Sequence, residues 1–173
     1  MIIRRMTEAD LPAVIQIDEQ SFSQPWPASA YDIELENEHS RCWVAEVDGN
    51  LKALLVIWRV LDEAHIGTIA VHPTFRRRGL GRLLLVSGMR ETYQEGARIY
   101  YLEVRAGNLA AQAMYINLGY DIVGRRNKYY KDNGEDALLM TLDLTQPDNP
   151  GTKLDFLSET LDDHSREPGS NRQ

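Results

Sequence analysis

The sequence lacks the features that mark secreted, membrane and nucleic-acid-binding proteins. It has one cysteine in 173 residues, so no disulfide can form within the chain, which suits a reducing compartment. No apolar run approaches the roughly 20 residues of a membrane span, and no segment has the pattern of a signal peptide. The formal net charge of −7 argues against a direct nucleic-acid surface. We therefore expect a cytoplasmic protein that contacts neither membranes nor nucleic acid.

The sequence also gives little indication of a metal site or of a catalytic thiol. The four histidines, His39, His65, His72 and His164, have no spacing to cysteine or carboxylates that would form a metal site. We therefore expect no metal. Cys42 lies in the segment 41–45, RCWVA, which predicts a buried strand, so we interpret it as a core residue instead of a nucleophile.

Apolar periodicity and turn residues predict one domain over residues 1–144. Strands are expected at 2–5, 42–47, 51–60, 65–71, 99–104 and 137–144, with one more before the last. Four helices are expected. The first begins at the capped segment 7–10, the second spans about 29–36, the third follows the glycine loop and ends at residue 95, and the fourth runs from 108 to 119. Residues 145–173 are rich in proline and polar residues, which favours a solvated, mostly disordered tail; the alternative is a short docking helix.

The first motif is the stretch 69–86, IAVHPTFRRRGLGRLLLV, which predicts a strand, a basic glycine loop and a helix. Pro73 cannot donate a ladder hydrogen bond, so the strand should stop near it. Gly79 and Gly81 let the backbone turn and approach a ligand closely. The loop amides and the helix dipole would then favour a phosphate, although a plain turn has the same pattern.

The glycine spacing narrows the choice of ligand. A Walker A loop needs a lysine after its second glycine, but Arg82 follows Gly81. A dinucleotide fingerprint needs a third glycine, but Leu84 occupies that position. The three successive arginines at 76–78 fit a local polyanion, the alternative being a solvated basic turn.

The second motif, YLEVRAGNLAAQAMYINLGY, spans residues 101–120. It begins as a strand, Asn108 suits the N-cap of a helix, and Gly119 suits the end of that helix. Asn108, Ala111 and Tyr115 are spaced to share one helix face. The alternative is a core tyrosine above a capped helix start.

In this order and on these elements, the two motifs resemble those of the GCN5-related N-acetyltransferase (GNAT) family. Within that family the chain resembles the RimI-type ribosomal-protein-alanine N-acetyltransferases, from about residue 3 to residue 144. The segments that carry this closer resemblance are Pro25-Trp26, 61–64, 69–71, 79–81, 102–105, 126–130 and 135–137.

The resemblance implies a fold and a co-substrate. The fold class would be α/β, with a mixed, mostly antiparallel sheet of about seven strands, about four helices, and a splayed parallel strand pair at the coenzyme site. Acetyl-coenzyme A would be held by loop amides and by free main-chain groups of the splayed strand, with Asn108 against the pantetheine arm. The residues so implicated are Ile69, Ala70, Val71, Arg76, Arg77, Arg78, Gly79, Leu80, Gly81, Arg82 and Asn108.

The resemblance also assigns catalytic roles. Acetyl transfer needs a neutral amine, a donor for the charge developing on the carbonyl oxygen, and a proton for the leaving thiolate. Glu103 would be the base, and we expect partial burial to raise its pKa; the alternative is an ion pair with Arg105. The amide of Val71 would be the donor. Tyr115, a phenol that keeps its proton until a thiolate forms, would be the acid.

The acceptor amine is less constrained. An α-amine is easier to neutralise than a lysine by about 3.5 kcal/mol, which favours a peptide N-terminus. Trp26, Tyr31, Tyr129 and Tyr130 lie where the peptide of the family would pass. Acidic residues that could attract a basic ribosomal tail, or could be ordinary surface charge, are Asp32, Glu34, Glu36, Glu38, Asp62 and Glu63.

The expected function is acetylation of a protein N-terminus, by resemblance the N-terminal alanine of a small-subunit ribosomal protein. Three alternatives stay open. The acceptor could be a lysine, a polyamine or a small molecule. The chain could be a non-catalytic coenzyme-binding regulatory module, or a ribosomal scaffold that uses its tail as the contact.

Overall fold

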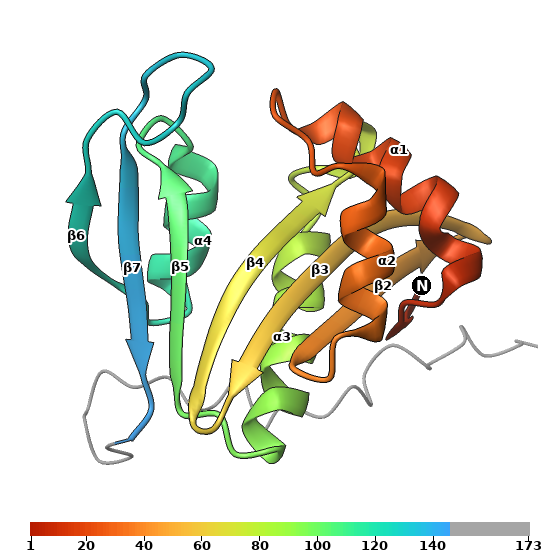
Figure 1. Cartoon of the computed structure of the whole chain (residues 1–173), viewed down its shortest axis with the longest axis horizontal. Helices are drawn as coiled ribbons and strands as arrows, with labels where there is room; N and C mark the ends of the chain where they lie inside the picture. The colour runs from red at the N-terminus through yellow and green to blue at the C-terminus, as the bar shows by residue number, and fades with distance from the viewer. Residues whose placement is uncertain (146–173) are drawn as a thin grey trace, which may run out of the picture.

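The computed structural model describes residues 1–145, which form one seven-stranded sheet in the order β1-β2-β3-β4-β5-β7-β6 (Figure 1). Every neighbouring pair is antiparallel except β4 and β5, which are parallel. The strands are β1 (Ile2–Arg5), β2 (Ser40–Val47), β3 (Asn50–Val60), β4 (Glu63–Val71), β5 (Ile99–Arg105), β6 (Asp121–Arg126) and β7 (Ala137–Asp143).

Helices cover both faces of this sheet. The helices are α1 (Leu11–Ser21), α2 (Ala28–Glu36), α3 (Leu80–Gln94) and α4 (Leu109–Asn117), with short 3-10 turns at Glu8–Asp10 and Pro73–Phe75. The pair α1 and α2 lies on the face toward the viewer in Figure 1, and α3 and α4 lie behind the sheet. The mixed α/β architecture, seven strands and four helices confirm the expected fold class.

The alternation of strand side chains divides the core into two layers. In β3, Leu54 and Val56 pack with α1 and α2, whereas Leu55 and Ile57 pack with α3 and α4. Cys42 is buried in the first layer, as expected of a core residue. Because successive strand residues point to opposite faces, a strand with apolar residues at nearly every position must be covered on both sides.

The first helix begins later than predicted. The capped start expected at 7–10 forms a 3-10 turn, in which the Asp10 carboxylate accepts hydrogen bonds from the backbone amide and hydroxyl of Thr7. Arg4 donates two further hydrogen bonds to the same carboxylate, of 2.7 and 2.8 Å. These contacts tie β1 to the start of α1.

The feature of the fold that creates the site is the short pairing between β4 and β5. Their register extends only from Glu63 opposite Ile99 to His65 opposite Tyr101, and beyond this the strands diverge. The upper end of Figure 1 shows the resulting fork, with the β6–β7 loop on one side and the α1–α2 loop on the other. The predicted splayed pair is confirmed.

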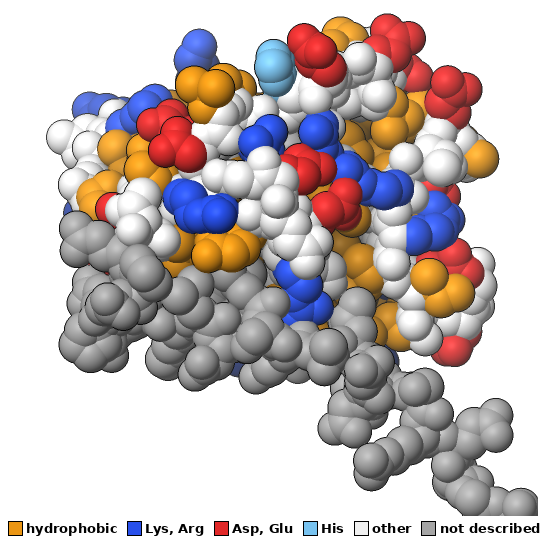
Figure 2. All heavy atoms as spheres, turned by 90° about the horizontal axis from the view of Figure 1, so that it is seen from below, with side chains coloured by type: hydrophobic (Ala, Val, Ile, Leu, Met, Phe, Trp, Pro, Cys, Tyr) orange, Lys and Arg blue, Asp and Glu red, His pale blue; other side chains and the backbone are white. Residues whose placement is uncertain are grey.

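The surface charges, the lengths of the helices and the end of the chain complete the description of the fold. On the face seen from below, described acidic and basic side chains are intermingled without one broad patch of either sign (Figure 2). Among the described residues, no helix is both long and apolar enough to cross a membrane. The expected tail at 145–173 lies, apart from Thr145, outside the described residues.

Candidate active site

A cavity of about 1150 Å³ fills the fork between the two strands. Its lining comes from the end of α1 and the loop after it, the outer half of β4, the glycine loop, the start of α3, the outer half of β5, and α4. Both sequence motifs therefore meet at one place, because the topology puts β4–loop–α3 beside β5–α4.

The glycine loop builds the half of the cavity suited to an anion. Gly79 adopts a left-handed conformation with φ +79°, as does Arg77 with φ +63°, and α3 begins at the next residue, Leu80. No side chain of the described residues caps the first turn of this helix, so its amides are free to bind a ligand. Arg76 and Arg82 also line the cavity. The loop thus supplies free amides, a helix dipole and positive charge.

The arginines of this loop are not equivalent. The guanidinium of Arg76 folds back and donates to the carbonyl of Val71 at 3.0 Å. Arg78 packs over the ring of Phe75 instead of lining the cavity. In this conformation Arg78 is therefore the least suited of the three to contact a coenzyme directly.

The outer half of β4 and the start of α4 form the cavity walls. Ile69, Ala70 and Val71 line the cavity at the edge of β4 that has no partner strand in β5, so this edge is free to bind an extended ligand. Asn108 caps α4, as predicted, by accepting from the amide of Ala111 at 3.2 Å, and it also lines the cavity. These residues fit a narrow pantetheine-like arm between the strands.

Glu103 lies on β5 just past the point where the strands separate. Its Oε2 lies 2.7 Å from Nε2 of His65, and its Oε1 lies 3.7 Å from the guanidinium of Arg126. The hydrogen bond from His65, with the charges of His65 and Arg126, lowers the pKa of Glu103 against the opposing effect of burial. The expectation of a raised pKa is therefore wrong.

The alternative partner proposed for Glu103 is also wrong. Arg105 points elsewhere and forms ion pairs with Asp132 at 2.9 Å and Glu135 at 3.1 Å. Glu103 is left facing the cavity, with 19% of its side chain exposed. The carboxylate is ionised and reaches the cavity, which is the state a base requires.

Tyr115 lies in α4 and lines the opposite wall of the cavity. Its side chain is buried against Tyr120, with ring centroids 5.6 Å apart. Burial raises the pKa of Tyr115 above the ordinary value of a phenol, so the hydroxyl stays protonated at neutral pH. Tyr115 is therefore both a buried core residue and a residue of the cavity wall.

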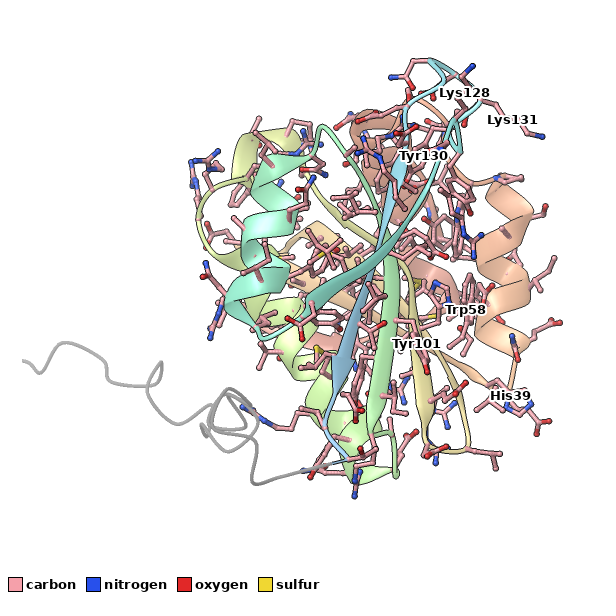
Figure 3. The ribbon with its side chains drawn as sticks, turned by 90° about the vertical axis from the view of Figure 1, so that its left-hand side faces the viewer. His39, Trp58, Tyr101, Lys128, Tyr130 and Lys131 are labelled. Atoms are coloured by element: carbon pink, nitrogen blue, oxygen red, sulfur yellow. The ribbon has the colours of Figure 1, made fainter. Side chains whose placement is uncertain are left out.

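On the side of the fork that α1 and α2 cover, aromatic side chains form a wall. Trp26 stacks on Trp58 with ring centroids 5.9 Å apart, and only Trp26 of the two lines the cavity. Tyr31 is fully buried beneath Trp26, so the expectation that it contacts a peptide is corrected: it supports Trp26 from the core. Figure 3 shows Trp58 on this side of the sheet, beside the helices that cover it.

The β6–β7 loop closes the fork from above. Arg105 stacks on the ring of Tyr130 at 3.8 Å and pairs with Asp132 and Glu135 of the loop. Asp132 in turn bonds the hydroxyl of Ser23 in the α1–α2 loop. Tyr130 lines the cavity, and Figure 3 shows it in the loop that also carries Lys128 and Lys131.

Tyr129 lies at the outside of this loop. It is 43% exposed, packs edge-on against Tyr130, and does not line the cavity. Of the four aromatic residues expected at the acceptor groove, the structure thus brings Trp26 and Tyr130 to the cavity.

Sequence reasoning missed His65, Trp58, Gly67 and the loop contacts of Arg105. A Cβ at Gly67 would lie 2.9 Å from the ring of Trp58, so the missing side chain makes room for that ring. The available signal was the alternation in the first part of β4, where His65 and Gly67 share one face. A bulge at Gly67 reverses the faces of the residues after it, and only the pairing of the strands shows this reversal and what lies opposite.

The match to known proteins agrees with this geometry. Residues 11–120 match the model of the acetyltransferase (GNAT) family. The chain belongs to the GNAT family of acetyltransferases.

The most informative relatives are bacterial and share the closer resemblance. A Bacillus subtilis protein, provisionally assigned as a [ribosomal protein bS18]-alanine N-acetyltransferase, is 38% identical over 83% of this chain and 96% of its own length. The Escherichia coli (strain K12) enzyme of that name is 34% identical over 83% of this chain and 97% of its own length.

Solved structures have the same fold. The E. coli enzyme superposes with a TM-score of 0.78 at 34% identity, covering 84% of this chain and 94% of that chain. NAA60 of Arabidopsis thaliana, solved in complex with acetyl-CoA, has a TM-score of 0.75 at 19% identity. The match covers 84% of this chain and 99% of that chain, so the two share the fold. The RimI-type resemblance and the enzyme class are confirmed.

Proposed function

We propose that this protein transfers the acetyl group of acetyl-coenzyme A to the free α-amine of a protein, with the N-terminal alanine of ribosomal protein bS18 as the best candidate. The observation that carries this proposal is the position of Glu103. Its ionised carboxylate faces the cavity at the fork of β4 and β5, between the anion-binding loop and the aromatic wall. The names of the bacterial relatives support the choice of acceptor.

The residues present fit the coenzyme. The free amides at the start of α3, with Arg76, Arg77 and Arg82, suit its phosphates, and the unpaired edge of β4 suits the pantetheine arm. Acetyl-coenzyme A supplies an activated thioester. The thioester would lie near Val71, which lines the cavity, and the amide of Val71 would stabilise the charge developing on the carbonyl oxygen.

The two catalytic side chains divide the proton transfers. Glu103 accepts a proton from the acceptor ammonium, directly or through one water molecule, which produces the neutral nucleophile. Its lowered pKa keeps it ionised at neutral pH, so the base is available in nearly every molecule. Tyr115 keeps its proton until the thiolate leaves, because its pKa is raised by burial. It donates that proton to the sulfur as the C–S bond breaks, which assists the transition state selectively. The second proton of the attacking nitrogen returns to the phenolate, so the products are the amide, the thiol and one proton on Glu103.

The low pKa of the base favours an α-amine over a lysine. A carboxylate is a weak base, and an α-ammonium gives up its proton more readily than a lysine ammonium by about 3.5 kcal/mol. The aromatic side chains of Trp26 and Tyr130 flank the cavity where the first residues of a peptide would lie. We also assign the protein to the cytoplasm, where such a substrate is made.

We assign catalysis to residues 1–144 and treat the following segment as dispensable for it. Every residue of the proposed mechanism lies in that range. A chain that ends at Leu144 is expected to keep the wild-type rate. A scaffold that depends on its tail would instead lose its activity in that truncation.

The deciding experiment measures thiol release from acetyl-coenzyme A with four acceptors. These are a peptide that begins Ala-Arg, the same peptide with a blocked N-terminus, a peptide whose only amine is a lysine, and a polyamine. Turnover with the free Ala-Arg peptide alone is the expected result. Turnover with the lysine peptide or polyamine would replace the proposed acceptor, and coenzyme binding without any turnover would favour a regulatory module.

A further inference from the structure

His65 occupies a position between the cavity and solvent. It is the last residue of β4 in register with β5, and its Nε2 lies 2.7 Å from Oε2 of Glu103. Its side chain is 38% exposed, against 19% for Glu103. Of the two residues, Glu103 alone lines the cavity. His65 therefore lies between Glu103 and the solvent, on the side of Glu103 away from the cavity.

The imidazole is held by an aromatic support. Its ring packs edge-on against Trp58, with centroids 5.7 Å apart. Trp58 is fixed by a 2.7 Å hydrogen bond from its indole nitrogen to Glu34 and by its stacking on Trp26. An exposed histidine that merely formed a surface ion pair would not need a ring fixed on its second side.

The proposed reaction produces a proton that must leave the site. An ammonium and a thioester give an amide, a thiol and one proton. Glu103 takes this proton, and it must lose it again before the next turnover. Because the substrates occupy the cavity side of Glu103, and histidine is the side chain that ordinarily exchanges protons between pH 5 and 8, the 2.7 Å hydrogen bond to the more exposed His65 offers a route outward.

We infer that His65 is the proton relay of the site, a positioning residue that empties Glu103 to solvent after each acetyl transfer; this rests on the proposed function. The O–H bond of the protonated Glu103 breaks, and an N–H bond forms at Nε2 of His65, leaving a carboxylate and an imidazolium. The imidazolium then loses its Nδ1 proton to water, which leaves Nε2–H donating to the ionised carboxylate, as in the resting site. When Glu103 is protonated in the next turnover, exchange with water moves the imidazole proton to Nδ1 and frees Nε2 to accept.

Charged groups around His65 include some that oppose a positive charge on its imidazole and some that favour it. Arg126 of β6, 3.7 Å from Glu103, opposes a positive imidazole. Glu103 itself, Glu34 of α2 behind Trp58, and Glu63 of β4, which bonds the hydroxyl of Tyr101 on β5, favour one. The relay thus lies among groups of both signs, and the 2.7 Å contact to Glu103 is the closest.

The test separates a relay from a structural hydrogen bond by comparing three variants. His65→Gln keeps an amide that can donate to Glu103 but cannot carry a proton, and His65→Ala removes the side chain. His39→Gln is the matched control, because His39 is also exposed and lies 3.7 Å from a carboxylate, that of Glu38.

A relay predicts that kcat falls about 10- to 100-fold in both His65 variants, with the KM for peptide and the Kd for acetyl-coenzyme A within about twofold of wild type. The pH profile of kcat should lose one titration. Added imidazole should restore part of the rate of His65→Ala and leave wild type and His39→Gln unchanged. A His65→Gln enzyme with the wild-type rate and pH profile, or no rescue by imidazole, would overturn the relay.

A measurement that does not need turnover distinguishes failure of the relay from failure of the proposed function. The His65–Glu103 hydrogen bond is followed by nitrogen NMR of the His65 imidazole in wild type and in Glu103→Gln. Loss of the carboxylate should change the chemical shift of Nε2. An unchanged chemical shift refutes the coupling, whatever the enzyme acetylates, whereas a changed one in a protein that acetylates none of the four acceptors supports the coupling and refutes the acceptor.

Discussion

The two halves of the cavity are built in different ways. The coenzyme half consists largely of backbone: a left-handed Gly79, the free amides at the start of α3, and the unpaired edge of β4. The acceptor half consists of side chains brought together from distant elements. These include Trp26 from the α1–α2 loop, Glu103 from β5 and Tyr130 from the β6–β7 loop.

This difference separates binding from selectivity. A phosphate-bearing arm common to many reactions can be held by main-chain groups, whose positions depend on the fold alone. Recognition of one acceptor and removal of its proton need particular side chains at particular distances. We therefore expect substitutions in the two halves to affect different constants.

The largest expected effect is on Glu103. Glu103→Gln removes the base and keeps the size of the side chain, so kcat with the peptide acceptor should fall about 100- to 1000-fold at neutral pH. The Kd for acetyl-coenzyme A, measured by calorimetry, should change less than twofold. A variant with the wild-type rate would remove Glu103 from the mechanism and erase the proposed division between the halves.

The next effect tests the backbone half. Gly79→Val forces a β-branched residue into a left-handed conformation, and relief of that strain should distort the loop and weaken coenzyme binding about 30- to 100-fold. Gly49→Val is the control. Gly49 has φ +74°, and neither glycine has an atom within 4 Å of an added Cβ, but Gly49 lies in the β2–β3 turn far along the chain from the loop. Equal loss of coenzyme affinity in both variants would show that only stability had changed.

A smaller effect is expected at the loop that closes the acceptor half. Arg105→Gln removes the ion pairs to Asp132 and Glu135 and the stacking on Tyr130. The KM for peptide should rise about 5- to 10-fold, because binding must then order the loop. Steady-state kinetics at saturating coenzyme measures this change. A rise in the coenzyme Kd instead would mean that the loop serves both halves.

These differences explain what could be predicted from the sequence. The glycine loop and the capped α4 are local patterns, and a local pattern fixes backbone geometry within a few residues. The splayed strands and the positions of Gly79 and Asn108 were therefore predictable once the family resemblance was seen. The same holds for the two core layers, which follow from the alternation of apolar residues in strands such as β3.

The side-chain half could not be predicted in the same way. The pKa direction of Glu103 was wrong because burial was considered without His65, which lies 38 positions earlier in the chain. Arg105 was the alternative partner considered for Glu103 because it follows two residues later on the same strand face, yet its partners come from a loop near residue 135. Tyr31 was placed in the groove, but α2 turns it into the core. Each error concerns a contact between elements.

The aromatic wall allows a graded test of the acceptor half. In Gly67→Ala, the added methyl would lie 2.9 Å from the ring of Trp58, which must shift and carry Trp26 with it. The KM for peptide should rise about two- to fivefold, with the coenzyme Kd unchanged. Gly81→Ala serves as the opposite control, because its methyl would meet Val71 at 3.3 Å within the coenzyme half. If both variants alter the same constant, the two halves are not independent.

The smallest effect concerns the scaffold under both halves, and it depends on pH. Arg4 and Thr7 lower the pKa of the buried Asp10 from 3.8 to about 2. Because the folded value lies below the unfolded one, the stabilisation is complete above about pH 4 and is lost as the pH falls toward 2. Asp10→Asn should therefore cost about 1–2 kcal/mol of unfolding free energy at pH 7, discounted for the partly exposed Arg4.

Urea denaturation of wild type and Asp10→Asn at pH 7 and pH 3 measures this loss. The difference between the two proteins should shrink at the lower pH, where wild type has begun to protonate Asp10. The kinetic constants of folded Asp10→Asn should match those of wild type, since the residue lies in neither half of the cavity. A difference that grows at pH 3 would reverse the sign of the linkage. Asp10 would then be stabilised in its protonated form, and the contacts from Arg4 could not be what holds β1 to α1.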